Sequence, residues 1–405
     1  MVKYFKIVLL LSMILPGISF AGSTIFALVP KSIGEHHYPY STAALGRGGF
    51  SMAFKDSLTI NQMNYAMWAY VPRTTFSLGM SYQGLTSENN LNRISSYDGS
   101  FLGGFLSIPL IEKRLATGFG ILPKSINKQS FLIKDVGIGT SADQEIKVDG
   151  TLSEVQLVMS LSIAENLSFG GFVYYILGKI NDQTKITYND RAYNDIIVEN
   201  EYHFYGKSPS FGVSAFYGMT PWLSIGARLK FPTQMEVYSK QKSISAGQTN
   251  EKYQDITFPA NWTVGITFQP FERWVLGGDI DIINWQSGYL FNDLPISGMN
   301  NNARIGVGIE RVPSKRRLAA YADKMNYRAG AFYSQLNYLS NGKAVDEYGI
   351  SLGFGFPITQ GNSRLDIAMQ MGKRGDIEIN GLSEMFFRFN FSISANELWF
   401  VRDDR

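Results

Sequence analysis

The feature that most constrains this chain is an alternation of apolar and polar residues that returns, after about residue 73, in fourteen separate runs. A period of two places successive side chains on opposite faces, as in a β-strand that buries one face. Because a turn or a polar stretch follows each run, we expect an all-β chain of many strands. The runs are 73–84, 98–109, 114–123, 149–162, 166–182, 203–217, 222–239, 254–268, 273–286, 301–312, 325–338, 345–357, 362–374 and 384–400.

The two faces of each run differ in chemistry. The runs 345–357 and 384–400 have aliphatic or aromatic residues on one face and small or polar residues on the other. In lipid, a spanning sheet needs an apolar outer face and must close on itself so that no backbone group is left unpaired. For run 254–268 the predicted lipid face is Ile256, Phe258, Ala260, Trp262, Val264, Ile266 and Phe268.

The connections between runs alternate in length. Short turns such as "IAEN", "GMTP" and "QPFER" would close one rim, and the longer stretches 124–148, 183–202 and 240–253 would form loops at the other. An even strand number with short turns on one rim and long loops on the other is typical of bacterial outer-membrane barrels. The sequence therefore predicts a transmembrane antiparallel β-barrel of about fourteen strands.

A soluble β-sandwich would also alternate, and strand length separates the two folds. Sandwich strands average about five or six residues, whereas crossing a bilayer at a tilt takes about 9–11. The observed runs match the longer value. Aromatic residues also collect at run ends, where a membrane barrel has its interfacial girdles. They are Tyr82, Trp222, Trp274, Trp285, Tyr289, Tyr338, Trp399 and Phe400.

The first residues of the chain predict a secretory signal peptide. Lys3 and Lys6 precede the apolar run 7–15, and small residues at Ser19 and Ala21 predict cleavage before Gly22. That run is shorter than the roughly 20 residues of a transmembrane helix. We expect a signal peptide at 1–21, an N-terminal segment at 22–72 and the barrel at 73–405, located in the bacterial outer membrane.

Composition excludes several classes of protein. The sequence has no cysteine, which removes disulfides, thiol catalysis, thiolate metal sites and a lipoprotein anchor. The net charge of +3 comes from 37 Lys and Arg scattered among 34 Asp and Glu, which does not indicate nucleic-acid binding. No linker or low-complexity tract divides the chain, so we expect one large domain.

The glycine-rich stretch "LGRGGFSMAFKD" (45–56) lies ahead of the strands. Ser51 stands where a dinucleotide-binding fingerprint needs its third glycine, and no apolar strand precedes the stretch. A fourteen-stranded barrel encloses a lumen that something must fill. We therefore expect Gly46, Gly48 and Gly49 to let the backbone pass close to the inner wall of the barrel or turn with positive φ.

Three stretches of the sequence are "ALGRGGFSMAFKDSLTINQMNYA", "SFGVSAFYGMTPWLSIGARLKFP" and "FPANWTVGITFQPFERWVLGGDIDIINWQ". Together they resemble motifs of the FadL/TodX-type outer-membrane transporters of long-chain fatty acids and other hydrophobic compounds. The resemblance covers about residue 40 to the end. It departs at Tyr65, where the family usually has proline after the asparagine at Asn64.

The resemblance implies a fourteen-stranded barrel plugged by an N-terminal hatch, with passive uptake of a hydrophobic ligand that leaves through an opening in the wall. It assigns Gly46, Arg47, Gly48, Gly49 and Asn64 to the hatch. Pro123 in "GILPKS" is a candidate strand interruption, because proline removes a ladder donor, or else the start of a loop.

Four basic residues, Arg228, Lys230, Arg304 and Arg328, are predicted to face the lumen. Any of them could orient a fatty-acid carboxylate by a charge-assisted hydrogen bond. The alternative is that inward charges pair across the barrel, for example with Asp279. The other predicted inward charges are Glu154, Asp281, Glu310, Glu347 and Arg388.

No spacing of Ser, Asp, Glu or His singles out a catalytic constellation, and His36-His37 lacks further nameable metal ligands. We therefore expect neither an enzyme nor a cofactor. The expected partners are a hydrophobic ligand and outer-membrane lipid, with possible outer-membrane protein partners. The competing hypothesis is a non-transporting scaffold, since similar barrels serve as docking subunits in protein-export machines of the Bacteroidota type.

Overall fold

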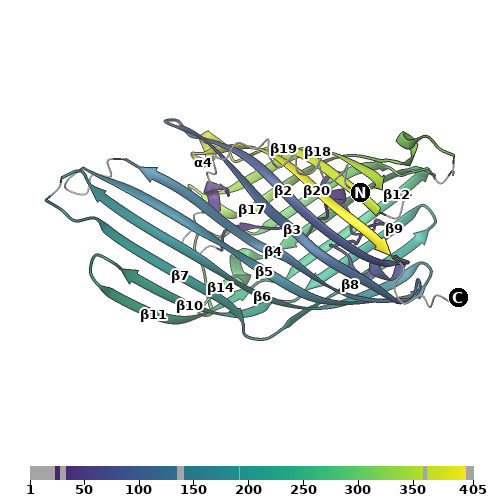
Figure 1. Ribbon diagram of the computed structural model, residues 1–405, viewed down its shortest axis with the longest axis horizontal. Coiled ribbons are helices and arrows are strands. Elements are labelled where there is room, and N and C mark those ends of the chain that lie inside the picture. The colour runs from purple at the N-terminus through teal and green to yellow at the C-terminus, as the bar shows by residue number, and fades with distance from the viewer. Residues whose placement is uncertain are drawn as a thin grey trace, which may run out of the picture.

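The computed structural model describes residues 23–27, 33–134, 141–190, 192–314, 316, 318–358 and 363–397. The predicted signal peptide (1–21) and residues 398–405 lie outside these ranges. Within them the chain forms a closed antiparallel β-barrel of fourteen strands (Figure 1), which confirms the predicted fold class.

Eleven barrel strands are single elements. β20 pairs with β2 along the whole of β2, which closes the barrel. The eleven are β2 (Thr74–Glu88), β3 (Arg93–Ile111), β4 (Leu115–Ile133), β5 (Ala142–Ala164), β6 (Leu167–Tyr188), β13 (Trp274–Ile283), β16 (Asn302–Arg311), β17 (Asn326–Ser340), β18 (Lys343–Ile358), β19 (Ser363–Arg374) and β20 (Ser383–Glu397).

The other three barrel strands are each built from two elements, and the break in each contains a proline: Pro209, Pro232 or Pro259. Because proline has no N–H to donate, it interrupts the ladder. The pairs are β7 (Ile196–Gly206) with β8 (Ser210–Thr220), β9 (Leu223–Lys230) with β10 (Thr233–Ser243), and β11 (Gln248–Phe258) with β12 (Asn261–Phe271).

The break at Pro259 makes part of the predicted face assignment wrong. Ile256 and Phe258 are buried inside the barrel, whereas Trp262 and the alternate residues after it are exposed on the outside. The residues between β11 and β12 shift the alternation by one position. Such a shift moves every earlier side chain of the strand to the opposite face.

The stretches 124–148, 183–202 and 240–253 are mostly strand, so the prediction of long loops there is wrong. The connection between β10 and β11 shrinks to the turn 244–247. These strand ends carry polar residues on both faces, so they lack the alternation of a bilayer-crossing segment. We call the projecting ends of β4 to β7, β10 and β11 the extension, and it occupies the left of Figure 1.

Side chains sort by face along the rest of the wall. Inward positions such as Ser107, Ser160 and Thr263 are buried and polar. No helix in the described ranges is long and apolar enough to span a bilayer. The exposed outward residues form an apolar belt that includes Phe76, Met80, Leu157, Val173, Ile266, Val307, Ile350 and Met385.

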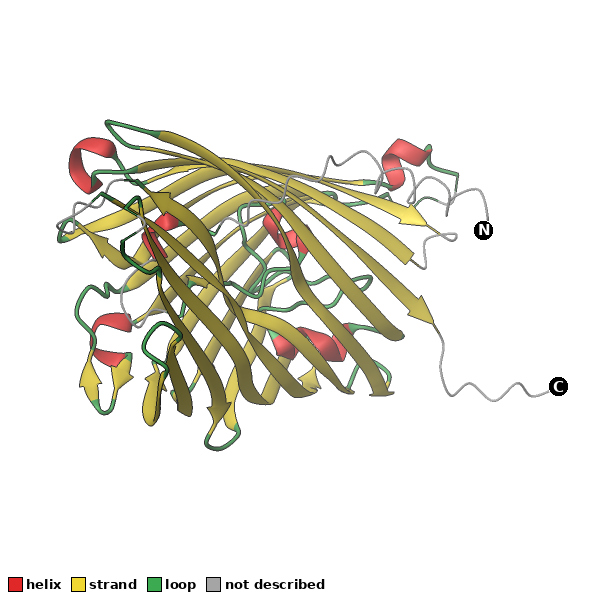
Figure 2. Cartoon of the chain, turned by 60° about the vertical axis from the view of Figure 1, so that its left-hand side comes forward, coloured by secondary structure: helices red, strands yellow, loops and turns green. Residues whose placement is uncertain are grey.

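Helices are short and lie in the N-terminal segment and the connections (Figure 2). One extended piece, β1 (Glu35–His36), pairs with β4, and a small hairpin of β14 (Leu290–Phe291) and β15 (Leu294–Pro295) follows β13. The helices are η1 (Ile25–Ala27), α2 (Thr42–Leu45), η2 (Tyr65–Tyr70), α3 (Trp285–Gly288), η3 (Tyr321–Lys324) and α4 (Ile377–Asn380).

Candidate luminal site

The N-terminal segment contacts inward-facing groups on widely separated strands. α2 packs against β18 and β19, and η2 packs against β5, β6 and β8. Ser41 caps α2 by accepting a hydrogen bond from the Ala44 N–H at 3.2 Å. Ser214 on β8 and Ser160 on β5 accept from the N–H groups of Ala66 and Ala69, both at 3.0 Å. The segment therefore bridges the lumen.

The glycine cluster meets the wall at backbone distance. A Cβ added to Gly46 would lie 2.8 Å from the Gly353 Cα, and one added to Gly48 would lie 2.3 Å from the Val307 oxygen. Gly48 and Gly49 also have φ of +76° and +101°. These values agree with the expected close approach of the glycines to the inner wall and with positive φ at Gly48 and Gly49.

Glycines of the barrel wall, which were not among the predicted site residues, also make this close contact. A Cβ on Gly306 would lie 2.3 Å from the Gly48 oxygen, and one on Gly308 would lie 2.4 Å from the Arg47 oxygen. Gly330 on β17 is equally close to the Gly48 nitrogen. Their signal in the sequence was glycine on the inward parity of two adjacent runs.

Arg47 joins the segment to β16. Its guanidinium forms a buried ion pair with Glu310, and its Nε donates to the Phe50 carbonyl oxygen at 2.7 Å. The guanidinium also lies over the Phe54 ring, 3.8 Å from the centroid. A buried charge paired in this way holds its partner strongly, because breaking the pair leaves an uncompensated charge.

Asn64 makes hydrogen bonds both within the N-terminal segment and to β8. Its side-chain amide donates to the Met52 carbonyl at 2.7 Å and to the Ala215 carbonyl at 2.9 Å, while its oxygen accepts from the Ala66 N–H. Asp279 on β13 accepts from the N–H groups of Ser51 and Met52 at 2.6 and 2.8 Å. The sequence did not predict that Asp279 would bind the backbone of the N-terminal segment.

Arg228 and Lys230 lie together on β9, and both are paired. Lys230 forms an ion pair with Glu154, and Arg228 donates to Asn261 at 2.7 Å and lies 3.8 Å from Asp281. The space beside them is about 20 Å³, which is room for about one water molecule. Contact of Arg228 or Lys230 with a ligand remains a prediction.

Arg328 is fully enclosed between two carboxylates. Its Nε lies 3.1 Å from Glu310, and its Nη1 lies 2.6 Å from Asp366. Arg364 bonds the same Asp366 and also reaches Asp56 of the N-terminal segment at 2.6 Å. Arg328 thus belongs to an ion network with Arg47, and a ligand carboxylate would have to displace one of its partners.

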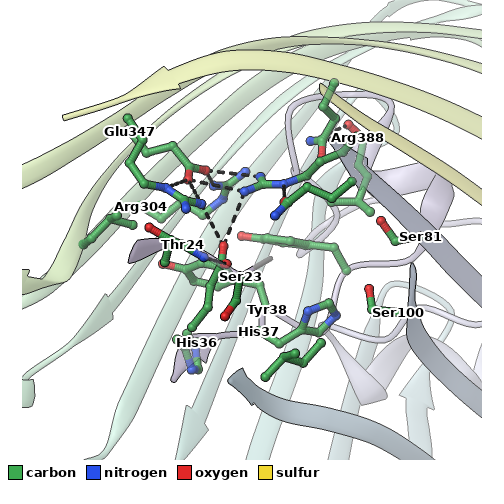
Figure 3. Close-up of a pocket in the computed structure, with 18 of the residues that line it drawn as sticks. Ser23, Thr24, His36, His37, Tyr38, Ser81, Ser100, Arg304, Glu347 and Arg388 are labelled. Carbon is green, nitrogen blue, oxygen red and sulfur yellow. Dashed lines mark hydrogen bonds and ion pairs between the residues drawn. The ribbon is translucent and has the colours of Figure 1, made fainter. Parts of the chain in front are cut away.

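Arg304 borders a cavity of about 120 Å³ (Figure 3). Its guanidinium lies 4.2 Å from the Phe332 centroid and 5.2 Å from that of Tyr38, and its nearest carboxylate, Glu347, is 3.9 Å away. Small-molecule pockets usually measure about 300–1,000 Å³. This cavity is smaller, and charged side chains, including that of Arg388, are part of its lining.

A cluster of ion pairs that the sequence did not predict encloses the same cavity. Arg374 lies 2.5 Å from Glu347, 2.7 Å from Glu35 of β1 and 3.1 Å from Glu384. Glu384 in turn accepts from Thr24 at 2.6 Å. Glu347 and Glu384 are the register partners of Arg374 on the neighbouring strands β18 and β20, whereas the N-terminal segment brings Glu35 to the cluster.

Apolar side chains fill the lumen toward the rim that bears the extension. The cluster includes Trp285 and Tyr289 from α3 and its C-terminal cap, both fully buried, with Phe258 and Met235 from the wall. The rings of Trp285 and Tyr289 lie 5.4 Å apart. This cluster has the chemistry of a hydrophobic pocket, but its own aromatic rings occupy the space.

β3 and β4 are paired next to the turn that connects them and separate farther along the wall. Among the described residues their pairing ends at Gly104 and Ile121, and β4 is irregular between Pro123 and Ser125. β4 nevertheless continues, so the alternative that Pro123 begins a loop is wrong. β1 pairs with β4 beside this irregularity, and Lys128 bridges to Asp98 on β3 at 3.0 Å.

The fold and the lumen define a bacterial outer-membrane type of barrel with an N-terminal segment inside it. Three solved structures share this fold: a FadL homologue of Pseudomonas aeruginosa and the toluene transporters TodX of Pseudomonas putida and TbuX of Ralstonia pickettii. Identities are 14%, 17% and 14%, and TM-scores are 0.64, 0.60 and 0.58. The matches cover 90%, 89% and 88% of this chain and 100%, 98% and 98% of the others.

The chain belongs to the BamG family, whose model matches residues 1–404. No curated protein matches the sequence. The predicted resemblance to FadL/TodX-type proteins is thus confirmed at the level of the fold, and the family that the whole chain matches is BamG.

Proposed function

We propose that this protein is an outer-membrane barrel that acts as a docking subunit for another outer-membrane protein. The observation that carries the proposal is the filled lumen. Ion networks around Arg328 and Arg374 and the aromatic cluster at Trp285 occupy the space in which a channel would need a continuous apolar path. A barrel closed in this way offers its rims and loops for contact instead.

The N-terminal segment supports the same proposal. We assign residues 22–72 to a hatch that fixes the barrel in one closed shape through Arg47 and the backbone contacts of Gly48. A rigid barrel with an apolar belt is a stable membrane anchor for a rim that binds a partner. Signal-peptide cleavage and outer-membrane location are part of the proposal.

Uptake of a hydrophobic compound is the second candidate. It is favoured by the fold shared with the toluene transporters and by the apolar luminal cluster. For uptake, Trp285 and Tyr289 would have to move, and Arg304 would orient a ligand carboxylate. Arg228, Lys230 and Arg328 remain the other predicted ligand contacts.

Two measurements on the same preparation separate the candidates. The tagged full-length protein is purified from its native membrane in mild detergent and analysed by native mass spectrometry, then reconstituted in vesicles for uptake of hexadecanoic acid and toluene. A docking subunit gives a stoichiometric complex with another membrane protein and no uptake above empty vesicles. A monomer that gives saturable uptake would refute the docking function and support transport.

A further inference from the structure

Within the part of the chain that the structure describes, the extension contains a strand edge that has no neighbouring strand over most of its length. β11 pairs with β10 at eleven consecutive positions without a bulge. On its other side, among the described residues, its strand pairing is confined to Ile256 and Thr257, which pair with β14. Residues 248–254 are therefore an open edge, which contains no proline.

The direction of the free backbone groups follows from the bonds that are made. The Asp255 N–H donates to the side-chain oxygen of Asn292 at 2.9 Å, and the Asp255 carbonyl accepts from the Asn292 N–H at 2.8 Å, both on the side away from β10. Because backbone groups alternate in direction along a strand, Tyr253, Glu251 and Thr249 present theirs to the same side. Three N–H groups and three carbonyls thus form a ready template for an added strand.

β14 lies beside β11 at two positions, and the chain then turns away from the β11 edge. β14 runs antiparallel to β11, and just beyond its end the Asn292 N–H still donates to the Asp255 carbonyl. Asn292 and Asp293 have φ of 49° and 64°, and the chain there reverses into β15. A partner strand alongside Tyr253 would extend the line of β14 in the same antiparallel direction.

Two rows of side chains cross the outer face of the extension and end at this edge. An aromatic row runs from His203 through Tyr238 to Tyr253, with ring centroids 5.9 and 5.2 Å apart. Tyr253, at its end, is 70% exposed. The next strand in such a row would place an aromatic residue opposite Tyr253.

The second row alternates in charge. Glu201 on β7 is directly opposite Lys240 on β10, and Lys240 is opposite Glu251 on β11, with 3.5 Å between the last two charged groups. Continuing the alternation requires a basic residue opposite Glu251. Because cross-strand pairs of opposite charge stabilise a sheet, a Lys or Arg fits this position.

From these observations we propose that the β11 edge binds an extended segment of a partner protein by strand addition. The segment runs antiparallel to β11 and carries an aromatic residue followed two positions later by Lys or Arg. Backbone bonds to Thr249, Glu251 and Tyr253 hold it, and the two side chains select it. The inference rests on the proposed docking function and names its contact surface.

A second copy of this chain fits the edge less well. A two-fold axis at Glu251 would oppose that carboxylate to itself, and one at Lys252 would oppose the ammonium groups. An axis at Tyr253 would oppose Glu251 to Asp255. Like charges directly opposite one another destabilise a strand pair. The charges in these three registers therefore favour a partner of different sequence as the occupant to test.

The probe is a fluorescent nine-residue peptide, Thr-Val-Thr-Tyr-Thr-Arg-Thr-Val-Thr, titrated with the full-length barrel in detergent micelles and followed by anisotropy. We expect saturable binding below about 1 mM, and at least tenfold weaker binding of the same peptide with Glu in place of Arg. Absence of saturable binding would overturn the proposal.

Three variants at one position test the mechanism. Glu251→Pro removes an N–H that faces away from β10, so the β10–β11 ladder is kept while binding of both peptides is lost. Glu251→Lys reverses the preference to the Glu peptide. Glu251→Gln is the matched control, which keeps the backbone donor and loses only the preference. Heat-modifiable migration on a gel verifies that each barrel is folded.

The remaining outcomes separate this inference from the function on which it rests. Peptide binding that survives Glu251→Pro would overturn strand addition. A concentration-dependent dimer that Glu251→Pro abolishes, without peptide binding, would assign the edge to a second copy. If the native complex persists in the Glu251→Pro protein, this edge is not the docking surface and the docking function stands. If the unsubstituted protein has no complex, the docking function itself fails.

Discussion

Replacing Gly48 by alanine should release the N-terminal segment from the wall. The new Cβ would lie 2.3 Å from the Val307 oxygen and 2.6 Å from the Ala331 oxygen, and both are backbone atoms of paired strands that cannot rotate away. The residue also has φ of +76°, which a side chain tolerates poorly. The segment rather than the barrel should therefore move.

The magnitude follows from two contributions. A side chain at positive φ costs about 1–2 kcal/mol, and overpacking against a fixed wall costs about 1–3 kcal/mol. Together they weaken docking of the segment by about 2–5 kcal/mol. At 1.4 kcal/mol for each factor of ten, the undocked population should rise about 30-fold to a few thousand-fold.

A single engineered thiol measures this population, because the chain contains no cysteine. Ser51→Cys places the thiol at a buried position, and its rate of maleimide labelling reports undocking. Gly342→Ala is the matched control, since Gly342 has φ of +70° but open space around its Cβ. Equal labelling of the engineered thiol with and without Gly48→Ala would refute the reasoning, as would an equal effect of the control.

Three further predictions concern ligand, pH and topology. If the protein carries fatty acids, Arg304→Met should weaken hexadecanoate binding about tenfold to a hundredfold, because a charged hydrogen bond contributes about 1.5–3 kcal/mol, and calorimetry that detects no change would remove Arg304 from the site. Burial would raise the pKa of Asp56, but Arg364 lowers it to about 2, so this contact should stabilise the segment fully above about pH 4 and be lost as the pH falls toward 2. Pepsin cleavage within 33–72 should appear over that interval, and Asp56→Asn should remove its dependence on pH. Cysteines in the turn 244–247 should be labelled on intact cells and those at 221–222 should not, with the reverse pattern contradicting the orientation.

Local alternation by itself determines the fold class of this chain. A period of two maintained over run lengths that match a tilted bilayer crossing leaves few alternatives to a membrane barrel. The glycines at 46, 48 and 49 also indicate a close backbone approach, because glycine is the residue that permits it. These features are read over a few neighbouring residues, which is why the sequence alone reveals them.

Other features depend on residues distant in the chain. Ile256 faces inward because the alternation of side chains shifts by one position at Pro259. An apolar–polar pattern with a period of two does not reveal such a one-residue shift. The ion pairs of Arg328 with Glu310 and Asp366 arise from strand register around the closed wall, so the sequence could indicate the inward charges but not their partners. The open edge of β11 is likewise a tertiary property, because a strand's free side depends on where β14 turns away, and only the assembled sheet decides that.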